Sequence, residues 1–503
     1  MTRSRPLRAA LAASVAVAIF LWWLAGRRYL ASNDEGIFLE GALRILRGQA
    51  PYRDFFILMG PGAFWLEVLA LKAFGVSLAA SHIVTIADLS VIAGCVCLLL
   101  ARWTSAGWAV WVALASMLLQ IADPAMAQAN HRLDSAAFAI AAVTLLTATR
   151  KNGFIAGLLA GFAAWITPSV ALVAMALLAW LCFAERGRFI PFLSGCVAVS
   201  ACCAAVLASQ RALAPMLDQM LWTGRNYGGA NFMPYGSRLG GYAAFFEGAS
   251  GGDIPSRILV LLALSMPALL PPIVLLLCRA GRARENRELV PVTIGAFALL
   301  LAAYPRFDVP HLTYAAPLFY VIAGFHLSRG NAAVRLGVFG LVCVLAAIPA
   351  GFGIFLRMHM VPVDSRVGRI VAMPADAEMI RAIERDVPEG ARVFCFPYLP
   401  MFYFLTLGEN PTRFSYLQPG MMEERDEQLA LAELRARPPD TILYQNVTPE
   451  MILRIWPNSD PRRLRLEKIE AFLRCGYRPI SAISYNGVPV RVLRRAPDES
   501  IGR

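Results

Sequence analysis

Charged residues are scarce in this sequence of 503 residues. Asp, Glu, Lys and Arg make up only 16% of it, and 58% of the residues are hydrophobic. A soluble globular protein is about 25% charged. Only three lysines occur (Lys72, Lys151 and Lys468), so arginine supplies almost all of the positive charge behind the net charge of +13. The composition excludes an ordinary soluble protein and predicts a polytopic membrane protein.

The motifs of familiar soluble enzymes are missing as well. The chain has no P-loop, no credible dinucleotide fingerprint, no G-x-S-x-G and no H-E-x-x-H. Their absence disfavours ATP-driven transport and the use of a nucleotide sugar by a soluble domain. No basic run is interleaved with aromatic residues, which disfavours nucleic-acid binding. None of the ten cysteines has C-x-x-C spacing, which disfavours a thiolate metal site.

Long apolar runs are what the sequence has in abundance. Several are shorter than the roughly 20 residues that a helix needs to cross a bilayer, and we expect those to extend into their loops. Counting them predicts a mainly α-helical membrane bundle of about eleven transmembrane helices. The runs are residues 9–26, 79–101, 106–122, 134–149, 153–166, 169–184, 190–209, 258–278, 290–304, 311–327 and 335–356.

The loop charges predict the orientation of these spans. Arg3, Arg5 and Arg8 precede the first run, which reads as an uncleaved signal anchor with a cytoplasmic N-terminus. Every short connection then assigned to the inside carries Arg or Lys, whereas the outer turn at residues 167–169 carries neither. An odd number of spans places the C-terminal tail outside. The domain prediction is therefore a transmembrane domain over residues 1–356 and an external domain over 357–503.

Two large loops, residues 27–78 and 210–257, fall on the outer side. Residues 59–75 of the first are apolar but contain Glu67 and Lys72, so we expect a juxtamembrane helix there and not a full span. The second loop is too long for a plain connector. Its weaker candidates for function are Arg225, Tyr227, Arg238 and Tyr242.

The tail from residue 357 has the composition of a soluble domain. Two of its stretches, residues 414–420 and 456–461, carry no motif with a recognisable chemistry. Its only cysteines are Cys395 and Cys475, for which a disulfide and two free thiols both remain open. A small α/β domain is predicted from helices at 374–387 and 462–474, strands at 391–396 and 440–445, and a hairpin of 480–485 and 488–493 through Asn486-Gly487.

Polar residues gather at three points on the predicted outer face. Asp34 and Glu35 follow the first span. They could act as a general base and its partner, or they could be the cap and the acidic first turn of a helix. His131, Arg132 and Asp134 open another span, where Arg and His could meet a phosphate or Asp134 could be a cap. Arg306, Asp308 and His311 lie in a third turn, which could also be a plain turn with a snorkelling arginine. Asp88, within a span, is a further candidate by its position, and His82 reads as a satisfied interfacial histidine.

The first outer loop resembles the GT-C superfamily of integral-membrane glycosyltransferases, which includes bacterial aminoarabinose transferases and mannosyltransferase-like proteins. The family pattern is an acidic pair after the first span, a helix that ends at glycine, a Pro-Tyr step, an acidic-aromatic pair, and a proline-containing helix that ends in Phe-Gly. The resemblance covers about 50 residues and rests on Asp34-Glu35, Gly48, Pro51-Tyr52, Asp54-Phe55, Gly60-Pro61 and Phe74-Gly75. Gly60-Pro61-Gly62 departs from the His-Pro-Pro of the protein O-mannosyltransferases, which argues against protein O-mannosylation.

The resemblance implies a polyprenyl-phosphate sugar donor and an acceptor met at the outer face of the bacterial inner membrane, with a periplasmic tail. It makes Asp34 the general base of an inverting displacement, with Glu35 assisting. Asp34 and Asp134 would be the ligands of a divalent metal cation, if one is used. It assigns phosphate or substrate binding to Tyr52, Asp54, His131, Arg132, Asp134, Arg306, Asp308 and His311.

A non-catalytic alternative is a transporter or assembly protein for lipid-linked polysaccharide, such as a polymerase, ligase or flippase. A transporter is expected to have polar residues at the membrane midplane and pseudosymmetric halves. Here the polar residues gather at one face and the halves look unlike each other, which favours the transferase.

Overall fold

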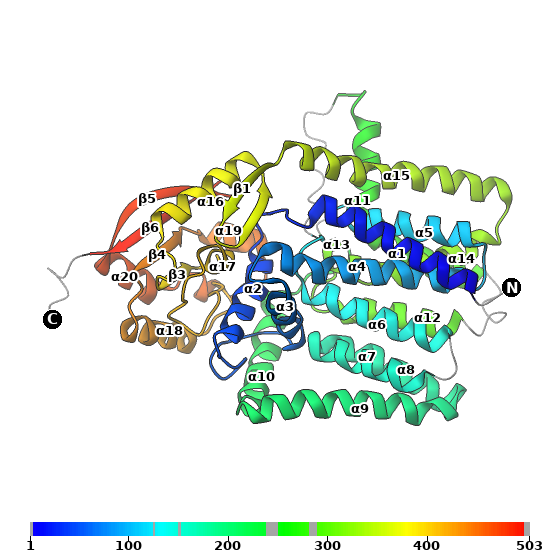
Figure 1. Cartoon of the computed structure of the whole chain (residues 1–503), viewed down its shortest axis with the longest axis horizontal. Helices are drawn as coiled ribbons and strands as arrows, with labels where there is room; N and C mark the ends of the chain where they lie inside the picture. The colour runs from blue at the N-terminus through cyan, green and yellow to red at the C-terminus, as the bar shows by residue number, and fades with distance from the viewer. Residues whose placement is uncertain (1–3, 124–125, 149–151, 238–249, 281–288, 497–503) are drawn as a thin grey trace. The chain divides into compact units, whose positions relative to one another are not determined.

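The computed structural model of the chain describes residues 4–123, 126–148, 152–237, 250–280 and 289–496 (Figure 1). The chain forms two compact units. The first, called the helical unit, comprises Met1–Gly26, Ile83–Cys203 and Met233–Met358. The second, called the mixed unit, comprises Arg27–His82, Ala204–Phe232 and His359–Arg503.

A helix occupies each of the eleven apolar runs found in the sequence, and these helices supply most of the helical unit. The prediction of a mainly helical fold is confirmed. The helices are α1 (Ser4–Ala25), α4 (Leu78–Leu100), α5 (Ala106–Gln120), α6 (His131–Ala148), α7 (Gly153–Ile166), α8 (Ala171–Ala184), α9 (Arg186–Ser209), α11 (Ile254–Ala280), α12 (Val290–Ala302), α14 (Ala316–Ser328) and α15 (Ala332–His359).

Five helices in the described part of the chain are long and apolar enough to cross a membrane: α1, α4, α9, α11 and α15. Five further apolar helices are shorter. The 13 residues of α12, for example, rise about 20 Å, against a hydrocarbon core of about 30 Å. The count of eleven spans therefore stays a prediction.

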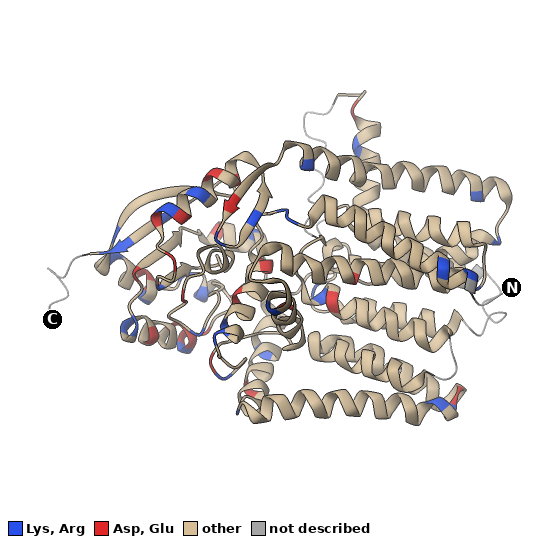
Figure 2. Cartoon of the chain, in the orientation of Figure 1, with Lys and Arg blue, Asp and Glu red and all other residues tan. Residues whose placement is uncertain are grey.

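Most helices of the helical unit run alongside one another, and neighbouring pairs such as α6 with α7 and α8 with α12 are in contact (Figure 1). Small residues allow the closest approach. A side-chain carbon built on Gly157 of α7 would lie only 2.0 Å from the carbonyl oxygen of Phe192 in α9. Close glycine contacts of this kind are typical of helix packing in membranes. Charged residues are sparse along these helices and lie mostly near their ends (Figure 2).

A four-stranded sheet with the strand order β3-β4-β6-β5 forms the centre of the mixed unit's C-terminal part. Strand β3 (Val393–Phe396) runs parallel to β4 (Thr441–Gln445), and the other pairs are antiparallel. The predicted hairpin is confirmed as β5 (Tyr477–Tyr485) and β6 (Val488–Arg495). Its turn is made by Asn486 and Gly487, both with positive φ, as a tight hairpin requires. Cys395 and Cys475 are both free thiols, the first buried and the second exposed.

Several elements of the mixed unit were not predicted. These include the hairpin of β1 (Val361–Ser365) and β2 (Gly368–Ala372), and helix α10 (Leu213–Ala230) within the loop 210–257. Of the predicted helices, α3 (Gly62–Phe74) and α16 (Pro374–Asp386) are present, while α20 (Glu467–Gly476) begins later than expected because residues 461–463 form a 3₁₀ turn. Helix α2 (Asn33–Leu46) is present where the sequence indicated a helix before Gly48, and the remaining helices are α17 (Met401–Thr406), α18 (Glu424–Ala436) and α19 (Pro449–Ile455).

The first outer loop shares one core with the C-terminal segment, whereas the sequence prediction had assigned it to the transmembrane domain. Leu39 and Leu43 of α2 belong to the same buried cluster as Tyr403 and Leu405 of the tail. Helices α2 and α17 touch at Gly36, where an added side-chain carbon would lie 2.1 Å from the backbone nitrogen of Met401. Only glycine fits this contact.

Replacing Gly36 by alanine is therefore expected to destabilise the mixed unit by about 1–3 kcal/mol, the usual cost of overpacking a tight contact. Thermal unfolding in detergent measures the effect. The matched control is Gly224→Ala in α10, because nothing lies within 4 Å of a side-chain carbon built there. That control is expected to be neutral or slightly stabilising, since alanine favours a helix more than glycine does. Equal stability of the two variants would contradict the α2–α17 contact.

Three sequence-based assignments lie outside the described residues. They concern Arg238 and Tyr242 of the second large loop, the charges at Arg150 and Lys151, and the basic stretch at residues 281–288.

Candidate active site

Asp34 and Glu35 form the first turn of α2, where acidic side chains face the positive end of the helix. The N-cap position is Ser32, with extended backbone at φ −111° and ψ 123°. Asp34 does not occupy this position, so Asp34 is not the cap of α2.

The side chain of Asp34 is exposed and is held by the C-terminal segment of the mixed unit. The hydroxyl of Tyr398 donates a hydrogen bond of 2.8 Å to Asp34 Oδ1. Burial, followed by the nearby Asp34 carboxylate, raises the pKa of Tyr398 well above its ordinary value. The phenol therefore stays protonated, and it orients the carboxylate as a permanent donor.

Glu35 points elsewhere because successive residues of a helix are turned about 100° apart. Its side chain is buried, and Glu35 Oε1 lies 2.8 Å from Nε2 of the equally buried His82. His82 is thus a satisfied histidine, as its sequence position indicated. The two neighbouring acids have different environments, and Asp34 is the one that a ligand could reach.

Tyr52 and Asp54 hold the loop between α2 and α3 in shape. Tyr52 is fully buried with a positive φ of 65°, and its hydroxyl donates to the carbonyl of Met59 at 2.7 Å. Asp54 accepts hydrogen bonds from the backbone of Ala50 and from the side chain of Arg53, and the Arg53 bond is the main reason that its pKa lies below the ordinary value. These contacts are internal to the loop.

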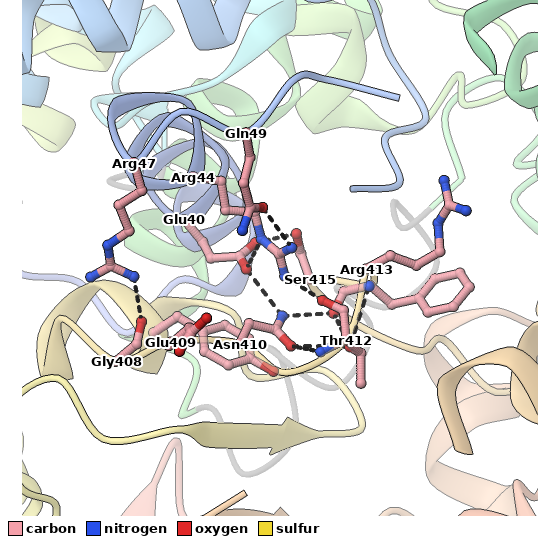
Figure 3. A network of polar contacts seen from close by, with 12 residues as sticks. Glu40, Arg44, Arg47, Gln49, Gly408, Glu409, Asn410, Thr412, Arg413 and Ser415 are labelled. Carbon is pink, nitrogen blue, oxygen red and sulfur yellow. Dashed lines mark hydrogen bonds and ion pairs between the residues drawn. The ribbon is translucent and has the colours of Figure 1, made fainter. Parts of the chain in front are cut away.

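A buried polar network holds α2 against residues 408–415, and the sequence analysis did not single it out. Glu40 accepts from Arg44 Nε at 2.5 Å, from Asn410 Nδ2 at 3.0 Å and from the hydroxyl of Ser415 (Figure 3). Arg44 also donates to the carbonyl of Thr412 at 2.7 Å. The i,i+4 spacing of Glu40 and Arg44 was the available signal, but such pairs are usually found on exposed helix faces.

The second group of candidates opens α6 in the helical unit. Asn130 Oδ1 accepts from the backbone nitrogen of Arg132 at 2.8 Å, so Asn130 and not Asp134 satisfies the start of the helix. His131 Nδ1 lies 2.8 Å from Thr167 Oγ1, and the Arg132 guanidinium donates to the carbonyl of Ala302 at 3.3 Å. Asp134 is buried and shares a hydrogen bond with the side chain of Asp88.

The third group forms an ion cluster around a carboxylate that is completely buried. Asp308 caps the short helix α13 (Val309–Thr313), receives a 2.8 Å contact from Arg306, and is hydrogen-bonded to Nδ1 of His311. Burial opposes the charge on Asp308, but the hydrogen bond and charge of His311, together with Arg306, hold its pKa well below the ordinary value. Burial, with the charges of Arg132 and Arg306, lowers the pKa of His311 to about 4. At neutral pH the cluster is an ionised aspartate beside a neutral imidazole.

These last two groups meet in the helical unit. Arg132, Ser135 and His311 line one cavity of about 20 Å³, which is room for about a single water molecule. The structure thus places Arg132 and His311 on one cavity, and Asp308 links His311 to Arg306. Asp34, Glu35, Tyr52 and Asp54 belong to the mixed unit.

The cluster predicts an acid-sensitive fold. The pKa of His311 lies near 4 in the folded protein and about 6.5 in the unfolded chain, so the folded form binds fewer protons. Stability is therefore full above about pH 6.5 and falls as the pH decreases toward 4, with Asp308 adding to the loss below that. In the His311→Asn variant, the fall in stability between pH 7 and pH 5 should be smaller by about 1–3 kcal/mol. Asparagine still donates a hydrogen bond to Asp308 but cannot be protonated in this pH range. Unfolding temperatures at pH 7 and pH 5 measure it, and an unchanged pH dependence would contradict the assignment.

In the described part of the chain, no three His, Cys, Asp or Glu side chains gather in a way that could hold a metal ion. The divalent cation expected at Asp34 and Asp134 stays a prediction, which an assay with and without EDTA tests.

The chain has a GT-C-like fold. The structure of ArnT from Cupriavidus metallidurans bound to undecaprenyl phosphate matches it with a TM-score of 0.58 at 14% identity, over 95% of this chain and 97% of that one. ArnT from the same organism in the apo state matches with a TM-score of 0.56 at 15% identity, over the same shares. No protein-family model and no curated protein sequence matches the chain. The resemblance seen in the first outer loop is thereby confirmed at the level of fold.

Proposed function

We propose that this protein is a glycosyltransferase of the bacterial inner membrane that takes a sugar from a polyprenyl-phosphate donor. The observation that carries the proposal is the ArnT-like fold over 95% of the chain, since one of the matching ArnT structures holds undecaprenyl phosphate. The exposed Asp34 at the start of α2, oriented by Tyr398, supplies a group that can do the chemistry.

In the proposed reaction Asp34 removes the proton from an acceptor hydroxyl. The acceptor oxygen attacks the anomeric carbon, the bond from that carbon to the donor phosphate oxygen breaks, and polyprenyl phosphate leaves with the bonding electrons. A single displacement inverts the anomeric configuration. A positioned general base of this kind contributes about 10²–10⁴-fold to a rate.

Arg132, Arg306 and His311 are the proposed contacts of the donor phosphate. Arginine forms charge-assisted hydrogen bonds with phosphate oxygens, and such donors stabilise the charge that grows on a leaving group. Asp308 orients Arg306 and His311, while His131 is held by Thr167 and Asp134 by Asp88. Glu35, Tyr52 and Asp54 keep α2 and its loop in place for Asp34. The proposed orientation has a cytoplasmic N-terminus and a periplasmic C-terminal segment.

Purified protein mixed with undecaprenyl-phosphate sugars and an extract of envelope acceptors tests the function. The expected result is release of free undecaprenyl phosphate that requires the acceptor. If the donor stays intact but crosses the bilayer of reconstituted vesicles, the protein is a flippase and the proposal is wrong.

Arg132→Gln is expected to weaken binding of undecaprenyl phosphate about 10–100-fold, because a charge-assisted contact to phosphate is worth about 1.5–3 kcal/mol. Titration of the purified protein with undecaprenyl phosphate measures the affinity. Arg329→Gln is the matched control, since Arg329 is exposed at the end of α14 and lies over the ring of Phe325. Equal affinities of the two variants would remove Arg132 from the phosphate site.

A further inference from the structure

Two stretches of the tail without a recognisable motif, residues 414–420 and 456–461, come together beside Asp34. Each contributes one aromatic residue, Tyr416 and Trp456, and both rings pack against Tyr398. The ring centroids of Tyr398 and Tyr416 are 4.5 Å apart at 63°, and those of Tyr398 and Trp456 are 5.7 Å apart at 60°. Tyr398 is the residue that donates to Asp34.

This group differs from the aromatic residues of the core. Tyr403 and Phe402, on the neighbouring helix α17, are completely buried, whereas Tyr398, Tyr416 and Trp456 are only half-buried. Three large rings thus keep part of their surface accessible next to an exposed carboxylate.

The combination matches the two surfaces of a sugar ring. The faces of a pyranose present C–H groups, which pack against the electron-rich face of an aromatic ring. The edge presents hydroxyl groups, which can donate to a carboxylate. Binding sites for small molecules commonly combine aromatic walls with one or two such polar groups. A hydrocarbon chain would fit worse, since it would strip water from Asp34 without supplying a donor.

We propose that Tyr398, Tyr416 and Trp456 form a saccharide-binding platform that presents a hydroxyl group of a pyranose to Asp34. The sugar can belong to the acceptor or to the donor, and its use in a transfer reaction rests on the function proposed above. The binding itself does not, because a platform of this kind holds a sugar whether or not a reaction follows.

Saturation-transfer NMR on the full-length protein in a sugar-free detergent tests the binding. The probes are D-glucose, D-mannose, D-galactose and N-acetyl-D-glucosamine, and the open-chain mannitol, which has no ring face, is the control. We expect saturation of the ring protons of at least one pyranose and none of mannitol. Trp456→Ala is expected to reduce that signal severalfold, while Tyr398→Phe, which keeps the ring and removes only the hydroxyl, retains most of it.

Trp22→Ala, at an exposed tryptophan of α1, controls for the loss of an indole and is expected to leave the signal unchanged. If Trp456→Ala does not fold, Tyr416→Leu removes a second ring of the platform and gives the same readout. Equal saturation of mannitol and the pyranoses, or an unchanged signal in a folded Trp456→Ala variant, overturns the platform.

The transfer assay then identifies the source of the sugar. A Trp456→Ala variant with a raised KM for the acceptor and an unchanged KM for the donor places the acceptor on the platform, and the reverse pattern places the donor there. Pyranose binding without any transfer leaves the platform standing and refutes the proposed function. Transfer that is insensitive to Trp456→Ala leaves the proposed function standing and refutes the platform.

Discussion

Asp34→Asn is expected to reduce sugar transfer by at least about 100-fold, the lower end of what a general base contributes. Asparagine has nearly the same shape and keeps an oxygen that accepts the hydrogen bond from Tyr398, so the mixed unit should remain folded. It cannot take a proton from an acceptor hydroxyl at neutral pH. The measurement is the initial rate of acceptor glycosylation at saturating donor, together with the affinity for undecaprenyl phosphate, which should not change.

The matched control for that variant is Asp364→Asn on β1, a carboxylate whose side chain is 91% exposed and only 3.9 Å from an exposed arginine. Its transfer rate should equal that of the natural protein. A normal rate in a folded Asp34→Asn variant would remove Asp34 from the reaction and leave the fold without an assigned base.

Glu40→Ala is expected to have the largest effect on stability, a loss of about 3–5 kcal/mol. The substitution leaves the Arg44 guanidinium buried without its carboxylate and removes the acceptor of Asn410 and Ser415. Uncompensated buried charges are costly because the interior solvates them poorly. A cavity of about 360 Å³ lined by Glu40 and Arg44 lets water reach the network, which moves the expected cost toward the lower end.

A double-mutant cycle separates this network from the simple loss of a side chain. Glu40→Met combined with Arg44→Met removes both charges and keeps apolar volume, so it should be less destabilising than either single substitution. Chemical unfolding of the four proteins measures the coupling. Additive effects would show that the two residues do not act as a pair.

The sequence predicted well those features that depend on local patterns. The eleven apolar runs became helices because each is a continuous apolar segment, and Asn486-Gly487 made the predicted hairpin because both residues accept positive φ. Asp34 was singled out by its place after the first span, and Arg132 and His311 by the density of polar residues around them.

What the sequence could not predict are contacts between segments far apart in the chain. Tyr398 and Asp34 are 364 positions apart in the chain, and Asn410 and Glu40 are 370 apart. No sequence pattern around any of these residues predicts its partner. Local composition also misled for α10, because the six residues from Gly224 to Gly229 include three glycines, an asparagine and a tyrosine, which is a composition typical of a loop. The different environments of Asp34 and Glu35 also could not be predicted, because they depend on which side of α2 faces Tyr398 and which side faces His82.

The anomeric configuration of the product tests the central claim most directly. NMR of the glycosylated acceptor, compared with the polyprenyl-phosphate donor, shows whether the configuration has changed at the transferred carbon. A single displacement with Asp34 as the base predicts inversion, with one polyprenyl phosphate released for each sugar transferred. Retention of configuration, or an intact donor after incubation with the acceptor, would contradict it.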